Sequence, residues 1–392
     1  MTSEFAPAKG KFWTPGIIIL AVFMAAALIA LIARFTGGLA YVTNNNDAYP
    51  WGIWIGINVA GGVGLAAGGF TTGALAHVFH RHHYHAIVRP ALFTALLGYT
   101  FVVIALLTDV GRYWNMISPM INWTTTSFLF AVAICVMIST NILYIECFPI
   151  FAERVCGSDM KGGGIFGPIL AFINRSLNKV MLIIILVGIV FSCLHQSSLG
   201  ALLLIAPSKM HPLWFSPLNP LLFLISAIAT AYPVVIFEQI LVSKSLSLKP
   251  KMPVISAMAA YVPYMLGTYF ILKTGDMIYR GTFKYLLDGT AQTNAFLVEM
   301  LIGLTLPLLL FMLPKIRQSQ GGLFFASSLA MFGVLINRIN VFLVGYTPPY
   351  GGSYFPSVSE IIVTIGLISA MMFFYKLAVM NLPIMAAEQE EI

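Results

Sequence analysis

The sequence has little charge and few polar stretches. Asp, Glu, Lys and Arg make up 9% of its 392 residues and hydrophobic residues 59%, whereas charged residues are about a quarter of an ordinary soluble domain. The longest polar interval, Phe148 to Asn178, is glycine-rich and too short for a soluble domain. Apolar runs long enough to cross a bilayer recur throughout. The sequence therefore predicts an all-α polytopic membrane protein, with residues 1–392 as one integral membrane domain.

Cysteine is also scarce, and none of it has a metal-binding spacing. Cys135, Cys147, Cys156 and Cys193 form no C-x-x-C pair, so we expect neither an iron–sulfur cluster nor a zinc site. The net charge of +7 reports the topology of a membrane protein rather than binding to nucleic acid.

The seven histidines lack a pair in the middle of the membrane. A membrane b-type haem is usually held by imidazoles that face each other within a bundle. Four histidines fall in the loop "HRHHYH" (80–85), His77 lies near the inner end of the second span, and His195 and His211 lie on the outer side. We therefore expect no haem and no metal, and interpret the loop as a basic inner loop that could bind metal adventitiously.

About ten spans are predicted, which we expect to form two four-helix bundles with flanking helices. The first is interpreted as a retained helix, because its apolar run is too long for a signal peptide. The spans are 14–34, 51–79, 90–110, 125–147, 179–195, 218–242, 254–273, 291–314, 322–344 and 359–379.

Most of the 21 Lys and Arg residues fall at the two ends of the chain and in the even-numbered loops. The positive-inside rule then places both termini in the cytoplasm. The odd-numbered loops, on the outer side, combine Tyr, Trp and Pro with clusters of polar residues. An interfacial aromatic belt explains part of this composition, and a surface that docks a partner or covers a ligand is the alternative.

A weak internal echo suggests a pseudo-repeat of residues 51–200 and 218–345. "TDVGRY" and "TGDMIYR" each place an Asp and an Arg at the outer end of a helix, four helices apart. Parallel repeats of this kind occur in membrane proteins, although so few matched residues are equally compatible with chance.

Ionisable residues at membrane depth are costly and are candidates for function. Asp109 and Arg112 close the third span and form either a local salt bridge or the rim of a polar pocket. The candidates for proton transfer are Glu299, Glu238, Glu146, Asp276 and Arg338. The alternatives are a buried Glu299–Arg338 ion pair and, for Glu146 and Glu238, a position at the membrane interface.

The second span, Gly56 to Ala76, is rich in glycine and has many small-xxx-small spacings. Such residues let helices approach closely, or leave space for a flat ligand. Asn58 lies on this helix beside that space and needs a hydrogen-bond partner.

A set of motifs occurs along most of the chain, from about Trp51 to Gly366. These are "YPWGIWIGINVAGGVGLAAGG", "VRPAL", "DVGRYWN", "HQSSLG", "HPLW", "GDMIYR" and "YGGSYFP". Together they resemble the NrfD/polysulfide-reductase family of membrane subunits. The resemblance is strongest to its HybB-like and HmcC-like branch, the membrane subunits of periplasmic hydrogenases and related transmembrane redox complexes.

The resemblance implies a haem-free subunit of the bacterial inner membrane. It would exchange electrons between a quinone, often menaquinone, and a ferredoxin-like iron–sulfur protein docked on the outer face, within a complex that also contains hydrogenase or multihaem cytochrome subunits. Carried over to this sequence, Asp109 and Arg112 match the family's D-x-G-R element, His195 and Gln196 its H-Q-S-S element, and Asn58 a polar position of the P-W-G helix.

One position departs from hydrogenase-type members, some of which have a Glu where Ala131 stands here. This departure favours a cytochrome-linked or other redox complex. In the resulting hypothesis, His195, Asp109 and Asn58 bind the quinone oxygens, and Arg112 stabilises developing charge or orients Asp109. A membrane anchor without its own quinone site and a secondary transporter are the alternatives.

Overall fold

The structure is a computed structural model that describes residues 5–79, 81–157, 160, 162–348 and 351–386. Within these residues, ten helices are long and apolar enough to cross a membrane, which confirms the all-α polytopic fold. These ten helices are α1 (Pro15–Gly37), Trp54–Val78 with α3 (Gly62–Gly73) at its centre, α4 (His85–Asp109), α6 (Phe128–Cys156), Gly164–Leu202 with α7 (Gly167–Leu202), α8 (Asn219–Leu246), Met252–Tyr279 with α9 (Met252–Ala259) and α10 (Val262–Tyr279), Ala291–Met312 with α11 (Ala291–Val298) and α12 (Leu306–Met312), Gln320–Val344 with α14 (Gln320–Ile339), and α15 (Val358–Asn381).

Several spans change their helical winding. Four segments are π-helical: Trp54–Gly61, Ala74–Val78, Glu299–Thr305 and Asn340–Val344. Widened turns of this kind often occur at functional sites, and three of these segments carry the polar residues Asn58, Glu299 and Asn340. The short elements are α2 (Leu39–Val42), α5 (Ser118–Ile121), α13 (Pro314–Arg317) and the 3₁₀ turns His82–Tyr84, Tyr113–Ile117, Gly164–Phe166, Pro207–Lys209 and Thr282–Leu287.

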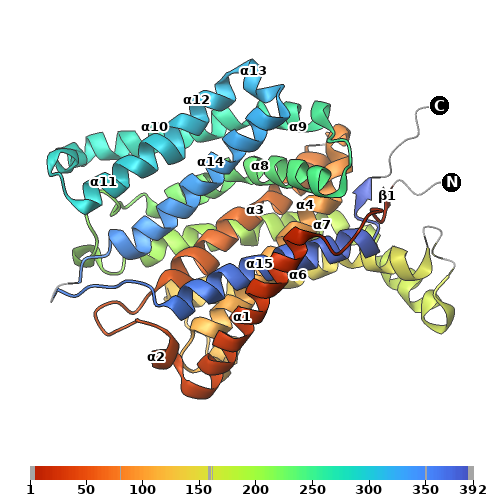
Figure 1. Ribbon diagram of the computed structural model, residues 1–392, viewed down its shortest axis with the longest axis horizontal. Helices are drawn as coiled ribbons and strands as arrows, with labels where there is room; N and C mark the ends of the chain where they lie inside the picture. Colours follow the sequence, from red (N-terminus) through yellow and green to blue (C-terminus); the bar gives the residue numbers. More distant parts are fainter. Residues whose placement is uncertain (1–4, 80, 158–159, 161, 349–350, 387–392) are drawn as a thin grey trace.

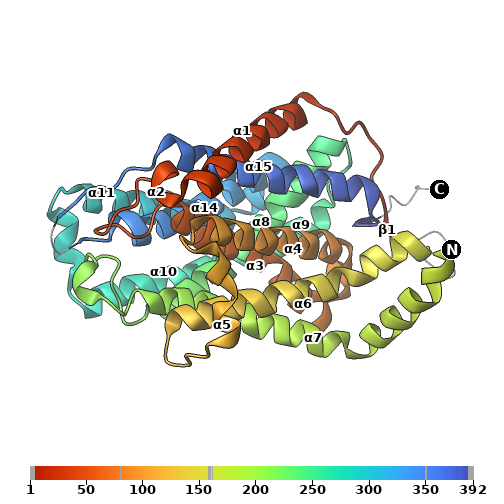
Figure 2. The same ribbon diagram turned by 90° about the horizontal axis from the view of Figure 1, so that it is seen from below.

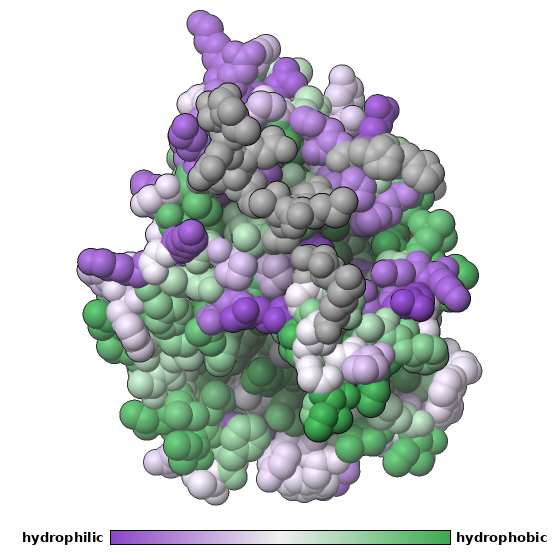
Figure 3. Space-filling model, turned by 90° about the vertical axis from the view of Figure 1, so that its right-hand side faces the viewer, coloured by the Kyte–Doolittle hydropathy of each residue, from purple (hydrophilic) through white to green (hydrophobic). Residues whose placement is uncertain are grey.

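Both chain ends lie at the same end of the helical bundle, which we call the terminal end (Figure 1). There β1 (Phe5–Ala6) pairs antiparallel with β2 (Met385–Ala386). Arg89 fastens this ribbon to the helices: its guanidinium lies over the Phe5 ring, donates to the carbonyl oxygen of Pro383 at 2.9 Å and pairs with Glu153 at 2.8 Å. Hydrophilic and hydrophobic side chains share this end of the molecule (Figure 3). The opposite end, with residues 39–53, 110–127, 203–218, 280–290 and 345–357, is called the loop end.

The helices pack in two groups of four and a flanking pair. The spans of α3, α4, α6 and α7 contact one another in the order α3–α4–α6–α7, and α7 also contacts α3. The spans of α8, α10, α12 and α14 form the second group, which meets the first through α3–α8 and α7–α8 contacts. The flanking helices α1 and α15 lie side by side, with α15 also against α4 (Figures 1 and 2). The pseudo-repeat of 51–200 and 218–345 stays a prediction.

The fifth span differs most from the expectation. The sequence suggested residues 179–195, after a polar interval at 148–178, whereas helix continues to Cys156 and resumes at Gly164, ending at Leu202. Apolar residues at helical spacing, such as Ile169, Phe172 and Ile173, make this interval helical, while interspersed polar residues and glycines hide it from a hydropathy window. His80 of the predicted inner loop 80–85 and Lys161 of the interval 148–178 lie outside the described residues.

Longer helices also correct the depth of three predicted site residues. His195 does not close its helix but lies within α7, which runs on to Leu202. Glu146 and Glu238 do not end their helices either, because α6 reaches Cys156 and α8 reaches Leu246. All three side chains are buried within the protein, so the two glutamates face protein rather than lipid or bulk water.

The glycines of the second span are used for close helix packing. A Cβ atom at Gly69 would lie 2.5 Å from the Cβ of Ala95 and 2.7 Å from the carbonyl oxygen of Ala91, both on α4. At Gly68 it would lie 3.0 Å from the carbonyl oxygen of Ala231 on α8. These contacts favour tight packing over space for a flat ligand.

We predict that Gly69→Ala lowers the midpoint of thermal unfolding in detergent. The added methyl group has to push α3 and α4 apart, and such overpacking commonly costs about 1–3 kcal/mol. Gly267→Ala is the matched control, because nothing lies within 4 Å of its Cβ position on α10 and Ala is the better helix former. Equal midpoints for the two variants would contradict this packing role.

Candidate functional site

Asp109 ends α4 at the loop end, and its partner is not Arg112. Val110 leaves the helical conformation, so Arg112 lies beyond the helix and is exposed. Among the described residues, no salt bridge joins the two. Arg34 of α1 lies there instead: it is buried and donates to the carbonyl oxygens of Thr108, at 2.8 Å, and Val110, at 2.9 Å. The predicted local Asp109–Arg112 bridge is therefore wrong, since the helix that would align the pair has ended.

Glu360, near the start of α15, is the second acid at this place. Its carboxylate accepts hydrogen bonds from the Tyr354 hydroxyl at 2.6 Å, from the backbone N–H of Ser357 at 2.8 Å and from that of Asn44 at 3.0 Å. The side chain is fully buried. A carboxylate in the first turn of a helix is also favoured by the helix dipole. Glu360 of α15 thus holds two loop-end segments, 39–53 and 345–357, through one charged group.

The two acids lie close enough to act on each other. Glu360 and Arg34 are the charged groups with an electrostatic effect on Asp109. The Oδ1 atom of Asp109 is buried and has no hydrogen-bond partner among the described residues. A buried polar atom without a partner is rare in folded proteins, so this atom is available to a water molecule or a ligand.

Tyr354 stabilises the Glu360 carboxylate as a hydrogen-bond donor. Its hydroxyl donates to Glu360 and accepts from the backbone N–H of Ile53 at 2.8 Å. Burial and the hydrogen bond to the Glu360 carboxylate both raise the pKa of Tyr354 above its ordinary value. The phenol therefore stays protonated and keeps donating to Glu360 across the neutral pH range.

Asn58 lies in the π-helical segment Trp54–Gly61, beside the turn of α15 that follows Glu360. Its amide donates to the Thr364 hydroxyl at 3.3 Å, and Thr364 in turn donates to the carbonyl oxygen of Glu360 at 2.9 Å. Trp54 donates to the same carbonyl oxygen at 3.0 Å. The predicted need of Asn58 for a partner is therefore met by α15, and Asn58 belongs to the Glu360 side of the bundle.

His195 and Gln196 lie elsewhere, in the interior of the first bundle. Both are almost completely buried, and neither ring nitrogen of His195 nor either amide atom of Gln196 has a hydrogen-bond partner among the described residues. The ring of Tyr99 lies 6.0 Å from that of His195, and its hydroxyl donates to Ser192 at 3.3 Å. The two adjacent residues thus form the densest group of unsatisfied polar atoms in this bundle.

The structure separates the predicted quinone-binding residues into two groups. Asp109 and Asn58 face α1 and α15 near the loop end, whereas His195 and Gln196 lie beside Tyr99. At about 1.5 Å per residue, Tyr99 is about 15 Å below Asp109 along α4. One quinone ring therefore cannot contact both groups, and the arrangement with His195 and Asp109 on a single head group does not fit the fold.

Glu299 is the centre of a polar network in the second bundle. Its carboxylate accepts from the indole N–H of Trp214 at 2.8 Å and from the amides of Asn337 at 2.7 Å and Asn340 at 2.9 Å. Arg338 donates to the Asn337 amide oxygen at 2.7 Å. Glu299 and Arg338 are therefore linked through an amide rather than by a direct ion pair.

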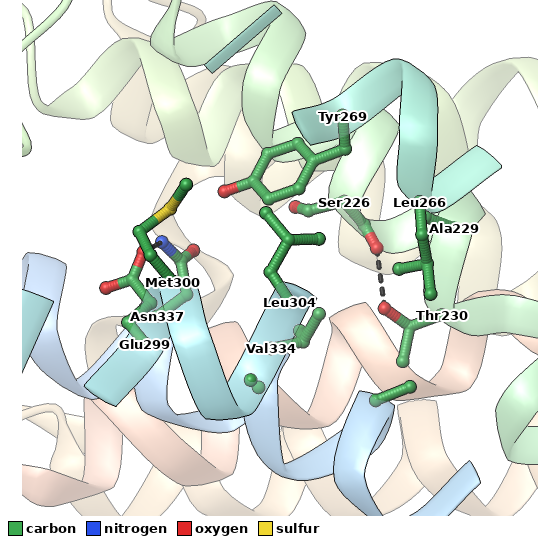
Figure 4. Close-up of a pocket in the computed structure, with 13 residues that line it drawn as sticks. Ser226, Ala229, Thr230, Leu266, Tyr269, Glu299, Met300, Leu304, Val334 and Asn337 are labelled. Atoms are coloured by element: carbon green, nitrogen blue, oxygen red, sulfur yellow. Dashed lines mark hydrogen bonds between the residues drawn. The ribbon is translucent and has the colours of Figure 1, made fainter. Parts of the chain in front are cut away.

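Further buried groups surround this network. Figure 4 shows Glu299 and Asn337 side by side, with Tyr269 and Ser226 across a small cavity. The cavity measures about 20 Å³, which is enough for one water molecule. Lys273, also buried, donates to the carbonyl oxygen of Leu213 at 3.3 Å. Two cations and one carboxylate thus lie together in the protein interior, where side-chain and backbone groups supply their hydrogen bonds.

Asp276, the last acid of the predicted echo, forms a complete salt bridge. Its carboxylate accepts from Arg280 at 2.6 and 2.9 Å and from Ser216 at 2.8 Å. Arg280 also donates to the carbonyl oxygen of Pro212 at 2.9 Å. These contacts hold the loop before α8 against α10, which is a structural role. Proton transfer by Asp276 stays a prediction that no contact favours.

Glu146 lies on a cavity near the terminal end. The cavity has a volume of about 250 Å³ and is lined by Glu146, Arg89, His77, His85 and apolar side chains of α4, α6 and α7. The Oε1 atom of Glu146 is buried without a hydrogen-bond partner among the described residues. A cavity of this size holds several water molecules at about 30 Å³ each, so Glu146 can exchange protons with water there.

Glu238 is buried between α8 and α15, where it accepts from the Tyr375 hydroxyl at 2.6 Å. Its second oxygen, Oε2, has no hydrogen-bond partner among the described residues. Among the described residues, no hydrogen bond joins Glu146, Glu238 and Glu299 to one another. A continuous proton path through these three glutamates therefore stays a prediction.

Sequence reasoning missed Arg34, Tyr354 and Glu360. Arg34 is one of the 21 Lys and Arg residues that the sequence used only to predict topology, and nothing in the sequence places α1 beside the end of α4. The sequence does indicate a local role for Glu360, since Ser357 and Glu360 have the spacing of a capping box. The structure contains this capping box. The box predicts a helix start but not the burial of its acid.

Comparison with known proteins gives one family along most of the chain. A profile of the family described as "Polysulphide reductase, NrfD" matches residues 41–349. A protein of Nitratidesulfovibrio vulgaris is 36% identical over 97% of both chains. The "Probable Ni/Fe-hydrogenase 2 b-type cytochrome subunit" of Escherichia coli K12 is 30% identical over 98% of this chain and 96% of its own. The "Menaquinone reductase, integral membrane subunit" of N. vulgaris is 22% identical over 94% and 91%.

We predict that Glu299→Ala destabilises the protein far more than Glu153→Ala. Removal of Glu299 leaves three donors and the nearby buried cations uncompensated, which typically costs about 3–5 kcal/mol. Glu153 forms a partly exposed bridge with Arg89, and loss of such a pair costs below about 1 kcal/mol. Thermal unfolding of both variants in the same detergent measures the difference. A small effect of Glu299→Ala would show that water satisfies the network.

Proposed function

The chain belongs to the NrfD family and is an integral membrane subunit of a respiratory redox complex; from this premise we propose that it carries a quinone site at the loop end of its first bundle. There the chain exchanges electrons between a quinone, most simply menaquinone, and a redox partner. The single observation that carries this proposal is the buried, unpartnered Oδ1 atom of Asp109, between Arg34 and Glu360.

The surroundings of Asp109 suit a quinone head group. Asp109 is itself partly exposed, so a ligand can reach it from the bilayer or the loop-end surface. Phe35 and Tyr113, with ring centroids 5.2 Å apart, supply aromatic surface beside it. Arg34 supplies a fixed positive charge, which stabilises negative charge that develops on a ring oxygen.

Proton exchange is the chemical task of these side chains. Reduction of a quinone to its quinol takes up two electrons and two protons, and oxidation releases them. Asp109 would give or take a proton at one ring oxygen, since its side chain is partly exposed and has an oxygen atom without a partner among the described residues. Glu360 is held by three donors and keeps Tyr354 and the loop in place. Arg112, which is exposed, would stabilise negative charge on the quinone ring rather than orient Asp109.

His195 and Gln196 are proposed as a second, deeper proton-exchanging pair. Their unpartnered atoms lie in the interior of the same bundle, about 15 Å below Asp109. Internal water there would connect them to the loop-end site. From the terminal end, Glu146 on its cavity is the first candidate for proton uptake, followed by Glu238, with Glu299 and Arg338 in the second bundle.

The partner is proposed to be a ferredoxin-like iron–sulfur subunit at the loop end, in a complex with hydrogenase or multihaem cytochrome subunits. The loops there are ordered by contacts with the helices, including the buried Trp214 and a backbone bridge between Met210 and Tyr346, which gives a firm docking surface. The distribution of basic residues supports a periplasmic loop end and cytoplasmic termini in a bacterial inner membrane.

We predict that Asp109→Asn lowers quinone-linked turnover of the purified complex by about 100-fold or more, the usual contribution of a general acid or base. The amide keeps the shape of the side chain but cannot exchange the proton. Asp47→Asn, on an exposed part of the same end, is the control and should retain full activity. Turnover is measured with a soluble quinol analogue, and co-purification of the other subunits measures assembly.

Assembly decides between the proposed function and its alternatives. If Asp109→Asn assembles normally and retains turnover, the site does not act on the quinone. If it loses the partner subunits, Asp109 serves docking, as in a membrane anchor. His195→Gln should assemble and slow turnover less than Asp109→Asn, because it acts at a distance from the ring.

We also predict that the purified subunit contains no haem, although one relative is named as a b-type cytochrome. Of the histidines whose side chains the structure describes, only His195 is fully buried, and its ring neighbour is Tyr99. A bis-imidazole haem requires two facing histidines. An optical spectrum of the reduced protein should lack cytochrome bands, and their presence at one haem per chain would refute this expectation.

A further inference from the structure

The hairpin formed by α6 and α7 is longer than a membrane requires. These helices have 29 and 36 residues, or about 43 and 54 Å at 1.5 Å per residue, whereas the hydrocarbon core is about 30 Å thick. Figure 2 shows their connected ends reaching beyond the other helices at the terminal end. We call this part, residues 150–179, the hairpin extension.

The hairpin extension carries large apolar side chains that no part of the described chain covers. Ile165 is 90% exposed, Phe166 68%, Ile169 56% and Phe172 71%. The opposite side of α7, including Leu170 and Leu177, is partly buried, because α7 packs against α6. The exposed residues therefore form one face of a packed hairpin.

This face continues directly into the membrane-facing side of α7. Ile165, Ile169 and Phe172 recur every three or four residues, as expected for one stripe of a helix. Ser176 is the one polar position, after which the same spacing continues through the span. The exposed residues of that continuation are Val180, Ile183, Val187, Val190 and Leu194. The apolar surface, broken only at Ser176, thus begins in the hydrocarbon region and ends in the hairpin extension.

Basic side chains border the stripe. Arg175 and Lys179 flank it on α7, and Arg154 lies on α6; all three are exposed. Of the two acids in the hairpin extension, Glu153 pairs with Arg89 and Asp159 lies outside the described residues. A helix with a continuous apolar stripe and flanking basic residues is typical of an element that lies in a membrane interface.

We propose that the hairpin extension binds the surface of an anionic phospholipid bilayer at the terminal end. Phe166, Ile169 and Phe172 enter the boundary between head groups and acyl chains, while Arg154, Arg175 and Lys179 contact lipid phosphates. Lipid covers this apolar stripe within the span, and the same kind of side chain continues into the hairpin extension. Lipid is therefore the partner that matches the whole stripe. The proposal does not depend on the quinone site.

The test uses the full chain in nanodiscs of phosphatidylglycerol with phosphatidylcholine, with a spin label at Phe172→Cys. Asn178→Cys, exposed on another side of α7, is the matched control, and the labelled wild type corrects for the native cysteines, of which three are buried. We expect the label at 172 to be more accessible to oxygen than to a water-soluble nickel chelate. The reverse order is expected at 178.

Two further measurements fix the role of charge and lipid. Replacing Arg175 and Lys179 by Gln should raise the accessibility of the label at 172 to the nickel chelate, and nanodiscs of phosphatidylcholine alone should do the same. Fluorescence of Ile169→Trp, compared with the wild type, should be quenched by brominated lipid. Equal nickel accessibility at 172 and 178, without quenching at 169, would overturn the proposal. The proposal would also be overturned if the label at 172 were shielded from the nickel chelate only in native membranes, because a protein partner would then cover the face.

Discussion

Every polar group inside this protein has to find its partner within the protein, because the surrounding hydrocarbon offers none. Two buried carboxylates show how the fold meets this constraint. Glu299 receives three side-chain donors from the loop before α8 and from the span of α14, and Glu360 receives three donors from the loop end. Each acid fastens segments that are far apart in the sequence, so charged groups as well as apolar packing hold the loop end in place.

The same constraint makes buried polar groups without a partner candidates for binding water or a ligand. Asp109, Glu146, His195 and Gln196 keep unsatisfied atoms, unlike Glu299 and Glu360, whose hydrogen-bond donors lie at 2.6–3.0 Å. Unsatisfied buried groups are expensive, and water or a bound ligand removes that cost. They lie at three depths between the loop end and the terminal end, which is the distribution that a subunit coupling quinone chemistry to proton movement would need.

Sequence reasoning recovered the fold class, the approximate spans and the family, because hydropathy and motifs report these directly. It did not recover contacts between distant helices. The sequence contains no sign that Arg34 meets the end of α4, or that His195 and Asp109 lie at different depths. It also misjudged residues 148–178, because hydropathy detects lipid-facing segments, whereas a helix that leaves the membrane can be polar in part. Residues that the resemblance grouped by motif were therefore separated by the fold.

The two Asp–Arg pairs show why local sequence did not decide the outcome. Asp276 and Arg280 are four residues apart on a helix that continues through Tyr279, so the side chains meet on one face. Asp109 and Arg112 are similarly spaced, but α4 ends at Asp109, and the helical geometry that a bridge needs is lost. Asp276 and Arg280 form a salt bridge that holds the loop before α8. Asp109 and Arg112 form none, and Arg34 instead binds the backbone on either side of Asp109. The end of one helix thus leaves the Oδ1 atom of Asp109 without a partner among the described residues, whereas the same residue types four positions apart on α10 form a salt bridge.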